Sequence, residues 1–244
     1  MKKIIISFLI VTLTTYAVAN EDWFYSTNGQ WCVAEDSGHL VWSSFPKTNE
    51  TVRWTGGSLD GKAHGNGTVV WFSDGKRTSI YTGGMHFGLH HGHGIATKSN
   101  GDTFETTWVN GRCDGNLIIK ATTGCQYRGA YTNGALTGQA VITWSNGRTY
   151  RGEVKNVQQH GYGREELAEG YVYEGQFADG KFNGNGTTIY PNGNRLEGTY
   201  KNSELSGIGT LKKANGERVK VIVENGKMKI LEPEGGAYLG GAGR

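Results

Sequence analysis

Proline, charged residues and long apolar runs are all scarce in this sequence. The 244 residues include 3 Pro, and Asp, Glu, Lys and Arg together make up 19% of the chain. Because proline is rare and the 40 glycines follow no three-residue period, a collagen-like triple helix is excluded. Beyond the N-terminal stretch, no segment is both long and apolar enough to predict a membrane-spanning helix.

Glycine and aromatic residues are abundant instead. With 7 Trp, 12 Tyr and 8 Phe, the chain has the large apolar side chains that intrinsically disordered proteins lack. Its 40 glycines disfavour a helical protein, because each glycine inside a helix costs about 1 kcal/mol relative to alanine. The composition therefore predicts an all-β protein with frequent turns.

The N-terminus has the layout of a secretory signal peptide. Lys2 and Lys3 precede an apolar run over residues 4–13, and the small residues Ala17 and Ala19 stand just before Asn20. The alternative is a membrane anchor, but a run of about 10 apolar residues is short for a spanning helix. We therefore predict a signal peptide at 1–19 and an exported protein, either periplasmic or secreted.

Export leaves a chain that is close to neutral. Removal of residues 1–19 takes away two lysines and no acidic residue, so the formal net charge falls from +3 to +1. Nucleic-acid binding and attachment to anionic lipid both depend on clustered positive charge. The sequence therefore predicts no nucleic-acid partner.

A 23-residue repeat occupies most of the remaining chain. Glycine follows most of its anchor residues at two, eleven, thirteen and twenty positions further on, and this regularity predicts a repeat architecture. We number the repeats one to eight by their anchors. After a first step of 27 residues the anchors recur every 23 residues, at Trp54, Tyr81, Phe104, Tyr127, Tyr150, Tyr173, Leu196 and Val219.

Each repeat carries the signals of a β-hairpin. Asn-Gly or Asp-Gly pairs such as Asn146-Gly147 supply the positive φ of tight hairpin turns. Between the turns side chains alternate, so that Tyr150, Gly152 and Val154 share one face of their strand. We infer that each anchor ring lies over a glycine of an adjacent strand, where no Cβ blocks it.

Three stretches resemble the MORN repeat, at 54–67, 150–163 and 173–186. The second reads Tyr-Arg-Gly-Glu-Val-Lys-Asn and continues to His-Gly-Tyr-Gly. The resemblance covers about 54–229. The sequence departs from the family pattern at repeats three, four and eight. Repeat eight has lost its last glycines, as a capping repeat does. The resemblance implies an elongated single antiparallel sheet of tandem 23-residue β-hairpins, and it does not imply one activity.

The segments that flank the repeats complete the predicted organisation. Residues 20–53 contain Trp23, Trp31 and Trp42, and we predict an N-terminal β cap that covers an edge strand of the array. The MORN-repeat array is expected over 54–231. The last residues, 232–244, are rich in glycine and are expected to form a flexible tail.

Histidines crowd into repeat two, at His86, His90, His91 and His93. His91 shares a repeat column with His64, so the repeat pattern alone explains it. Neighbouring imidazoles are able to bind Zn²⁺, Cu²⁺ or Ni²⁺, but this spacing matches no structural zinc pattern. We predict a solvated polar loop without a functional metal site or cofactor, and keep weak metal binding at these four histidines as the alternative.

No catalytic arrangement is recognisable in the sequence. Cys113 and Cys125 fall near opposite edges of the predicted sheet, roughly 25 Å apart, whereas a disulfide requires Cα atoms about 4–7 Å apart. We therefore predict that they do not pair with each other. Glu165 and Glu166 are interpreted as solvated residues at a strand end, since an open sheet of hairpins offers no enclosed pocket.

These observations favour a non-enzymatic scaffold or interaction protein. We expect it to dock protein partners along an extended β surface, with self-association as a further option. MORN arrays occur before catalytic domains in other proteins, but here the repeats leave about 13 residues after the last unit. The alternative is a module that binds cell-envelope glycan or the lipid headgroups of a membrane surface.

Overall fold

The computed structural model describes residues 28–132, 135–167, 169–224 and 227–231. Over these ranges the chain forms β-strands joined by turns and contains no helix. The chain divides between Gln158 and Gln159 into two compact units, which we call the N-terminal unit and the C-terminal unit. The predicted signal peptide at 1–19 and the predicted tail at 232–244 lie outside the described residues.

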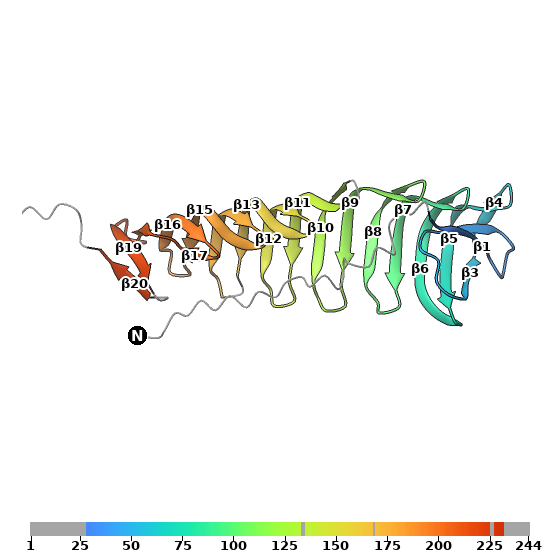
Figure 1. Ribbon diagram of the computed structural model, residues 1–244, viewed down its shortest axis with the longest axis horizontal. Coiled ribbons are helices and arrows are strands. Elements are labelled where there is room, and N and C mark those ends of the chain that lie inside the picture. The colour runs from blue at the N-terminus through green and yellow to red at the C-terminus, as the bar shows by residue number, and fades with distance from the viewer. Residues whose placement is uncertain (1–27, 133–134, 168, 225–226, 232–244) are drawn as a thin grey trace, which may run out of the picture. The chain divides into compact units, whose positions relative to one another are not determined.

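The N-terminal unit is built from hairpins that follow one another along the chain (Figure 1). From β5 to β12 each strand pairs antiparallel with the next. The strands are β1 (Gln30–Val33), β2 (Leu40–Ser43), β3 (Glu50–Trp54), β4 (Gly57–Leu59), β5 (Lys62–Ser73), β6 (Lys76–His86), β7 (Leu89–Lys98), β8 (Thr103–Val109), β9 (Arg112–Lys120), β10 (Gln126–Thr132), β11 (Ala135–Thr143) and β12 (Thr149–Lys155).

The C-terminal unit repeats this plan. Its strands pair antiparallel in chain order, except that β16 pairs with both the short β17 and β18. They are β13 (Gln158–Glu166), β14 (Val172–Ala178), β15 (Lys181–Ile189), β16 (Arg195–Lys201), β17 (Glu204–Leu205), β18 (Ile208–Lys212), β19 (Arg218–Glu224) and β20 (Lys227–Ile230). The predicted all-β fold of tandem hairpins is confirmed.

The stretch before the repeats adds the one parallel contact between named strands of the described chain. β1 and β2 form a hairpin in which Trp31 lies opposite Trp42, and β2 then meets β5 in parallel at Leu40 and Lys62. The sequence predicted only antiparallel pairing, because the repeat pattern does not extend into this stretch. Strand β3 pairs antiparallel with β5, as the hairpin of repeat one requires. The role of residues 20–53 as a cap stays a prediction.

The anchor rings lie over glycines, as predicted. A Cβ placed on Gly94 would lie 2.4 Å from Cε2 of Tyr81, and one on Gly186 would lie 2.5 Å from Cζ of Tyr173. Real Cβ atoms do not approach ring carbons this closely, so only glycine leaves room for the ring. Tyr81 and Tyr173 are both fully buried. Burial of these rings is what holds neighbouring hairpins together.

A hydrogen bond at the tip of each polar anchor was not predicted. The donor lies on the anchor and the acceptor is the carbonyl oxygen three residues later, where the strand register commonly shifts by a bulge. The bond closes a short local loop, within one strand for the tyrosines and from β3 to β4 for Trp54, and satisfies the buried donor. It joins Trp54 Nε1 to Gly57 (2.7 Å), Tyr81 Oη to Gly84 (2.9 Å), Tyr127 Oη to Ala130 (3.3 Å), Tyr150 Oη to Glu153 (2.5 Å) and Tyr173 Oη to Gln176 (3.0 Å).

Candidate functional site

The face of the N-terminal unit opposite the anchor rings carries a regular row of side chains. Each member is paired in register with the next, so the row runs across β7 to β12. Its members alternate between an aliphatic residue on the second strand of a repeat and a charged residue on the first strand of the next. We call this set the outer row: Ile95, Glu105, Ile118, Arg128, Val141 and Arg151.

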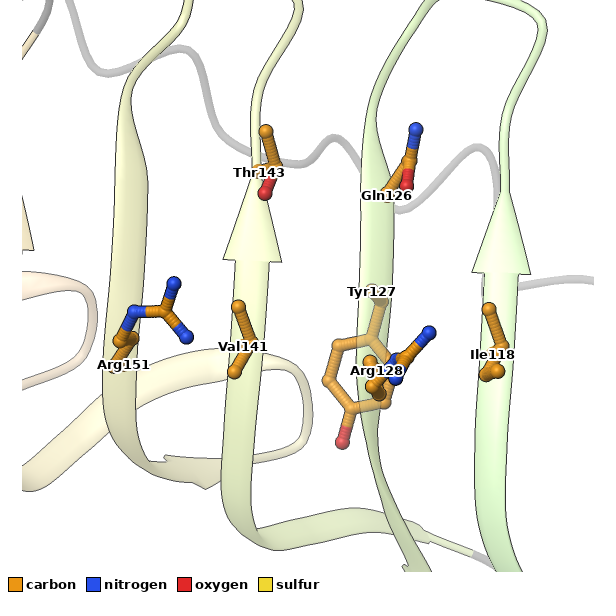
Figure 2. Close-up of a pocket in the computed structure, with 7 residues that line it drawn as sticks. All are labelled: Ile118, Gln126, Tyr127, Arg128, Val141, Thr143 and Arg151. Atoms are coloured by element: carbon orange, nitrogen blue, oxygen red, sulfur yellow. The ribbon is translucent and has the colours of Figure 1, made fainter.

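Two equivalent subsites make up the end of the outer row near β12. Ile118 pairs with Arg128, and Val141, 23 residues further along the chain, pairs with Arg151. Figure 2 shows the guanidinium of Arg128 turned toward the strand of Ile118 and that of Arg151 turned toward the strand of Val141. The 23-residue repeat has therefore placed the same aliphatic–arginine combination twice.

A shallow groove joins the two subsites. It encloses about 210 Å³ and is lined by both aliphatic–arginine pairs together with Gln126, Thr143 and Tyr127. In Figure 2 the ring of Tyr127 lies on the other side of its strand, as expected for an anchor. A groove this open exposes its lining to a second molecule but encloses no small substrate.

Neither arginine in the groove has a partner for its charge within the described ranges. Among the residues that the structure describes, no ion pair or hydrogen bond engages the side chain of Arg128 or Arg151, and both are exposed. The acidic member of the outer row, Glu105, accepts a hydrogen bond from His93 over 3.2 Å. The groove therefore has two uncompensated positive charges beside exposed aliphatic carbon.

The equivalent face of the C-terminal unit is different, because its charges are paired with one another. Glu174 forms ion pairs with Arg164 and with Arg195, the latter at 3.7 Å. Arg164 also reaches Glu166 at 3.1 Å. Desolvation is the largest single effect on the pKa of Arg164 and lowers it, but the hydrogen bonds and charges of Glu166 and Glu174 together outweigh it and raise the pKa. Arg164, Glu174 and Arg195 therefore present little uncompensated charge to a partner.

The four histidines singled out from the sequence do not form the predicted solvated loop: His86 ends β6, the other three lie on β7, and the four side chains separate. His90 packs against Tyr81 and Trp108, with ring centroids 4.0 and 5.1 Å away. His93 turns to Glu105, while the rings of His86 and His91 lie 5.1 Å apart. Within the described part of the chain no three His, Cys, Asp or Glu side chains are arranged to hold a metal ion. Weak metal binding, the alternative kept for these histidines, stays untested.

One histidine near this cluster was missed. His64 on β5 lies 5.3 Å from His86, measured between ring centroids, and so joins the pair formed by His86 and His91. The repeat column that His64 shares with His91 was the available signal. That His64 on β5 lies near His86 on β6 and His91 on β7 follows from the strand pairing, which the repeat column alone does not predict.

Burial shifts the pKa of two titratable groups inside the sheet, His90 and Cys32. Burial lowers the pKa of His90 to about 4, so its ring is neutral at pH 7. Burial, and to a smaller extent the nearby Glu50, raises the pKa of the Cys32 thiol to about 11. Cys32, Cys113 and Cys125 form no disulfide, in line with the prediction that Cys113 and Cys125 do not pair with each other.

The interpretation of Glu165 as a solvated residue was wrong. Its side chain is fully buried and accepts a hydrogen bond from Gln159 over 2.7 Å. Glu165 occupies the repeat column that holds Val69, Ala96 and Ile142 in other repeats, all of which are buried. Strand alternation therefore directs its side chain inward, and Gln159 supplies the hydrogen bond that a buried carboxyl group needs.

Comparison with known proteins gives one family match. The family model described as MORN repeat matches more than half of the chain, and the matched segments omit repeats three and eight. Repeat three is where Thr106 and Leu117 replace glycines, yet β8 and β9 still pair there as a hairpin. The matched segments are residues 54–77, 81–103, 127–147, 150–170, 173–195 and 197–218.

The other comparisons are more distant. No curated protein matches this sequence. Among solved structures, the SAS-4 (dCPAP) TCP domain of Drosophila melanogaster, determined in complex with a proline-rich motif of Ana2 (dSTIL), is similar with a TM-score of 0.41 and 12% sequence identity. The match covers 73% of this chain and 99% of that chain. In the described residues, no helix has the length and apolar character needed to cross a membrane.

Proposed function

Because this chain belongs to the MORN-repeat family, we propose that it is an exported, non-enzymatic interaction protein that docks a protein partner on the outer row of its N-terminal unit. MORN repeats generally serve as interaction modules for proteins or membranes. The observation that carries the proposal is the groove in which Arg128 and Arg151 stand unpaired beside Ile118 and Val141. Arginine is one of the residues enriched in protein–protein interfaces and in their hot spots.

Two further observations support a binding role over a catalytic one. The groove is shallow, and none of its lining side chains is a nucleophile with a neighbouring base. The tyrosine beneath it, Tyr127, has a pKa raised to about 12 by burial, so it holds its proton at neutral pH. Export is part of the proposal and is supported by the signal-peptide layout of residues 1–19.

A glycan is the alternative ligand, and one surface feature favours it. Trp31 on β1 is 42% exposed, packs edge-on against Trp42 and lies 4.8 Å from the ammonium of Lys62. An exposed indole with an adjacent hydrogen-bond donor suits stacking against a sugar ring. Binding of a cell-envelope glycan would then depend on Trp31 and leave the outer row unused.

The proposal is tested by photo-crosslinking of the exported protein. A photoreactive amino acid at Val141 is expected to crosslink to a protein from the exported fraction, because the groove is the docking surface. The same amino acid at Thr187 is the matched control: this residue lies in the corresponding row of the C-terminal unit, between Glu174 and Glu197. Equal crosslinking at both positions contradicts docking on the outer row.

Two other outcomes would point elsewhere. The glycan alternative would be favoured if the protein is retained on cell-envelope glycan, if Trp31→Ala abolishes this retention, and if Val141 gives no crosslink. Recovery of uncleaved protein from the cytoplasm only would contradict export, whereas a mature chain that begins at Asn20 would support it.

A further inference from the structure

We infer that the groove of the N-terminal unit recognises an extended acidic segment of its partner, with one carboxylate on Arg128 and a second on Arg151. This inference rests on the proposed function and adds the chemistry of the ligand. It is carried by the two aliphatic–arginine subsites, which the repeat has placed in equivalent positions.

The spacing of the subsites sets the spacing of the acidic groups. Arg128 and Arg151 both pair with Val141, from opposite sides, so their strands are separated by one intervening strand. Neighbouring strands lie about 4.8 Å apart, which puts the two arginine backbones about 10 Å from each other. Three residues of an extended chain in the polyproline II conformation span about 9 Å and complete one turn, so side chains three residues apart lie on the same face. Carboxylates three residues apart therefore match the two guanidinium groups.

The chemistry of each subsite favours a carboxylate flanked by apolar side chains. A guanidinium group presents a planar fork of donors that matches the two oxygens of a carboxylate. The aliphatic stem of each arginine and the adjacent Ile118 or Val141 form an apolar strip next to that fork. Ile95, which is 41% exposed in the same row, continues the strip toward β7.

The charge distribution favours an acidic peptide over an anionic membrane. The outer row holds two arginines and one acid, Glu105, which would repel a continuous anionic surface at its other end. Membrane attachment by charge generally uses clusters of four to eight basic residues. Two fixed positive charges at a set spacing instead suit two discrete carboxylates.

The test measures binding of a labelled peptide by fluorescence anisotropy with the full mature chain. The probe carries glutamate at every third position with leucine and serine between, and its counterpart carries glutamine in place of each glutamate. We expect the acidic probe to bind and the glutamine probe to bind at least about tenfold more weakly. Added salt is expected to weaken the acidic probe, because its contacts are exposed charge pairs.

Substitution of the arginines locates the binding. Arg128→Gln and Arg151→Gln are each expected to weaken the acidic probe by about fivefold, the upper range for an exposed charge pair, and the double variant by roughly twentyfold. The matched control is Arg195→Gln, since Arg195 is already paired with Glu174. Unchanged circular dichroism and melting temperature show that the variants fold, as expected for exposed side chains without partners.

Several results would overturn the inference. Equal affinity for the two probes would show that carboxylates are not recognised, and an equal loss on Arg195→Gln would place the contact elsewhere. Binding to phosphatidylglycerol vesicles that requires Arg128 and Arg151, without binding of the acidic probe, would replace the peptide with a membrane. A protein crosslink at Val141 that survives in the double variant would refute acidic recognition and leave the proposed docking function standing.

Discussion

Gly94→Ala is expected to lower the free energy of unfolding of the N-terminal unit by about 2 kcal/mol, as overpacking of a filled core does. The added Cβ would lie 2.4 Å from both Cε2 and Oη of the Tyr81 ring. The ring must then move, which strains the hydrogen bond from its hydroxyl to Gly84. Urea denaturation followed by tryptophan fluorescence measures the loss.

Repeat four shows how the strand accommodates such a methyl group. Ala140 takes the place that glycine holds in repeat two, and the hydrogen bond from Tyr127 to Ala130 is 3.3 Å long there, against 2.9 Å between Tyr81 and Gly84. Adaptation of this kind keeps the expected loss moderate.

Gly57→Ala is the matched control for Gly94→Ala. A Cβ on Gly57 would meet only the carbonyl oxygen of His64, at 3.4 Å, and this residue is exposed on β4. We expect a change within about 0.5 kcal/mol. If Gly94→Ala were as well tolerated as Gly57→Ala, the ring-over-glycine packing would not be what requires glycine at this position.

His90→Leu is expected to remove an acid-sensitive contribution to the stability of the N-terminal unit. Burial lowers the pKa of His90 from its ordinary value of 6.5 to about 4. Between these two pH values the unfolded chain binds a proton that the folded chain does not, so stability falls as the pH falls from 6.5 to 4. The shift corresponds to a loss of about 3 kcal/mol by pH 4.

Leucine is the appropriate replacement because the same repeat column holds Leu136 and Leu205, both buried. The unfolding free energy of wild type minus that of His90→Leu, measured by urea denaturation at pH 7 and at pH 4.5, is expected to decrease toward acid, because only the wild type carries this histidine. His93→Gln, at an exposed position, is the control and should follow the wild type. A wild-type minus His90→Leu difference that is independent of pH would contradict the buried, neutral imidazole.

The fold could be predicted from the sequence because every repeat carries the same turn residues, glycine positions and alternation of side chains. The alternation of Tyr150, Gly152 and Val154 predicted which side chains lie inward, and the glycine columns predicted the ring packing. The hydrogen bond from each polar anchor to the carbonyl three residues later escaped prediction. It depends on the bulge next to the anchor, and a bulge has no distinct residue pattern here.

The candidate site was much less accessible from the sequence. Residues 127–129 and 150–152 read Tyr-Arg-Gly, and they resemble residues 173–175, which read Tyr-Glu-Gly. The sequence shows whether the central residue of each motif is positively or negatively charged, but it does not show which side chains surround that charge. The strand register was needed to show that Glu174 is neutralised by Arg164 and Arg195 whereas Arg128 and Arg151 have no such partner among the described residues.

The opposite placement of anchor rings and outer row has a consequence for how such a chain diversifies. Residues that hold the hairpins together point one way from each strand, and residues available to a ligand point the other way, because strand side chains alternate. Substitutions at positions such as Arg128 or Val141 can therefore change what is recognised while the glycine–tyrosine contacts behind them persist. Duplication or deletion of a whole 23-residue repeat would therefore add or remove one aliphatic–charged pair of the outer row.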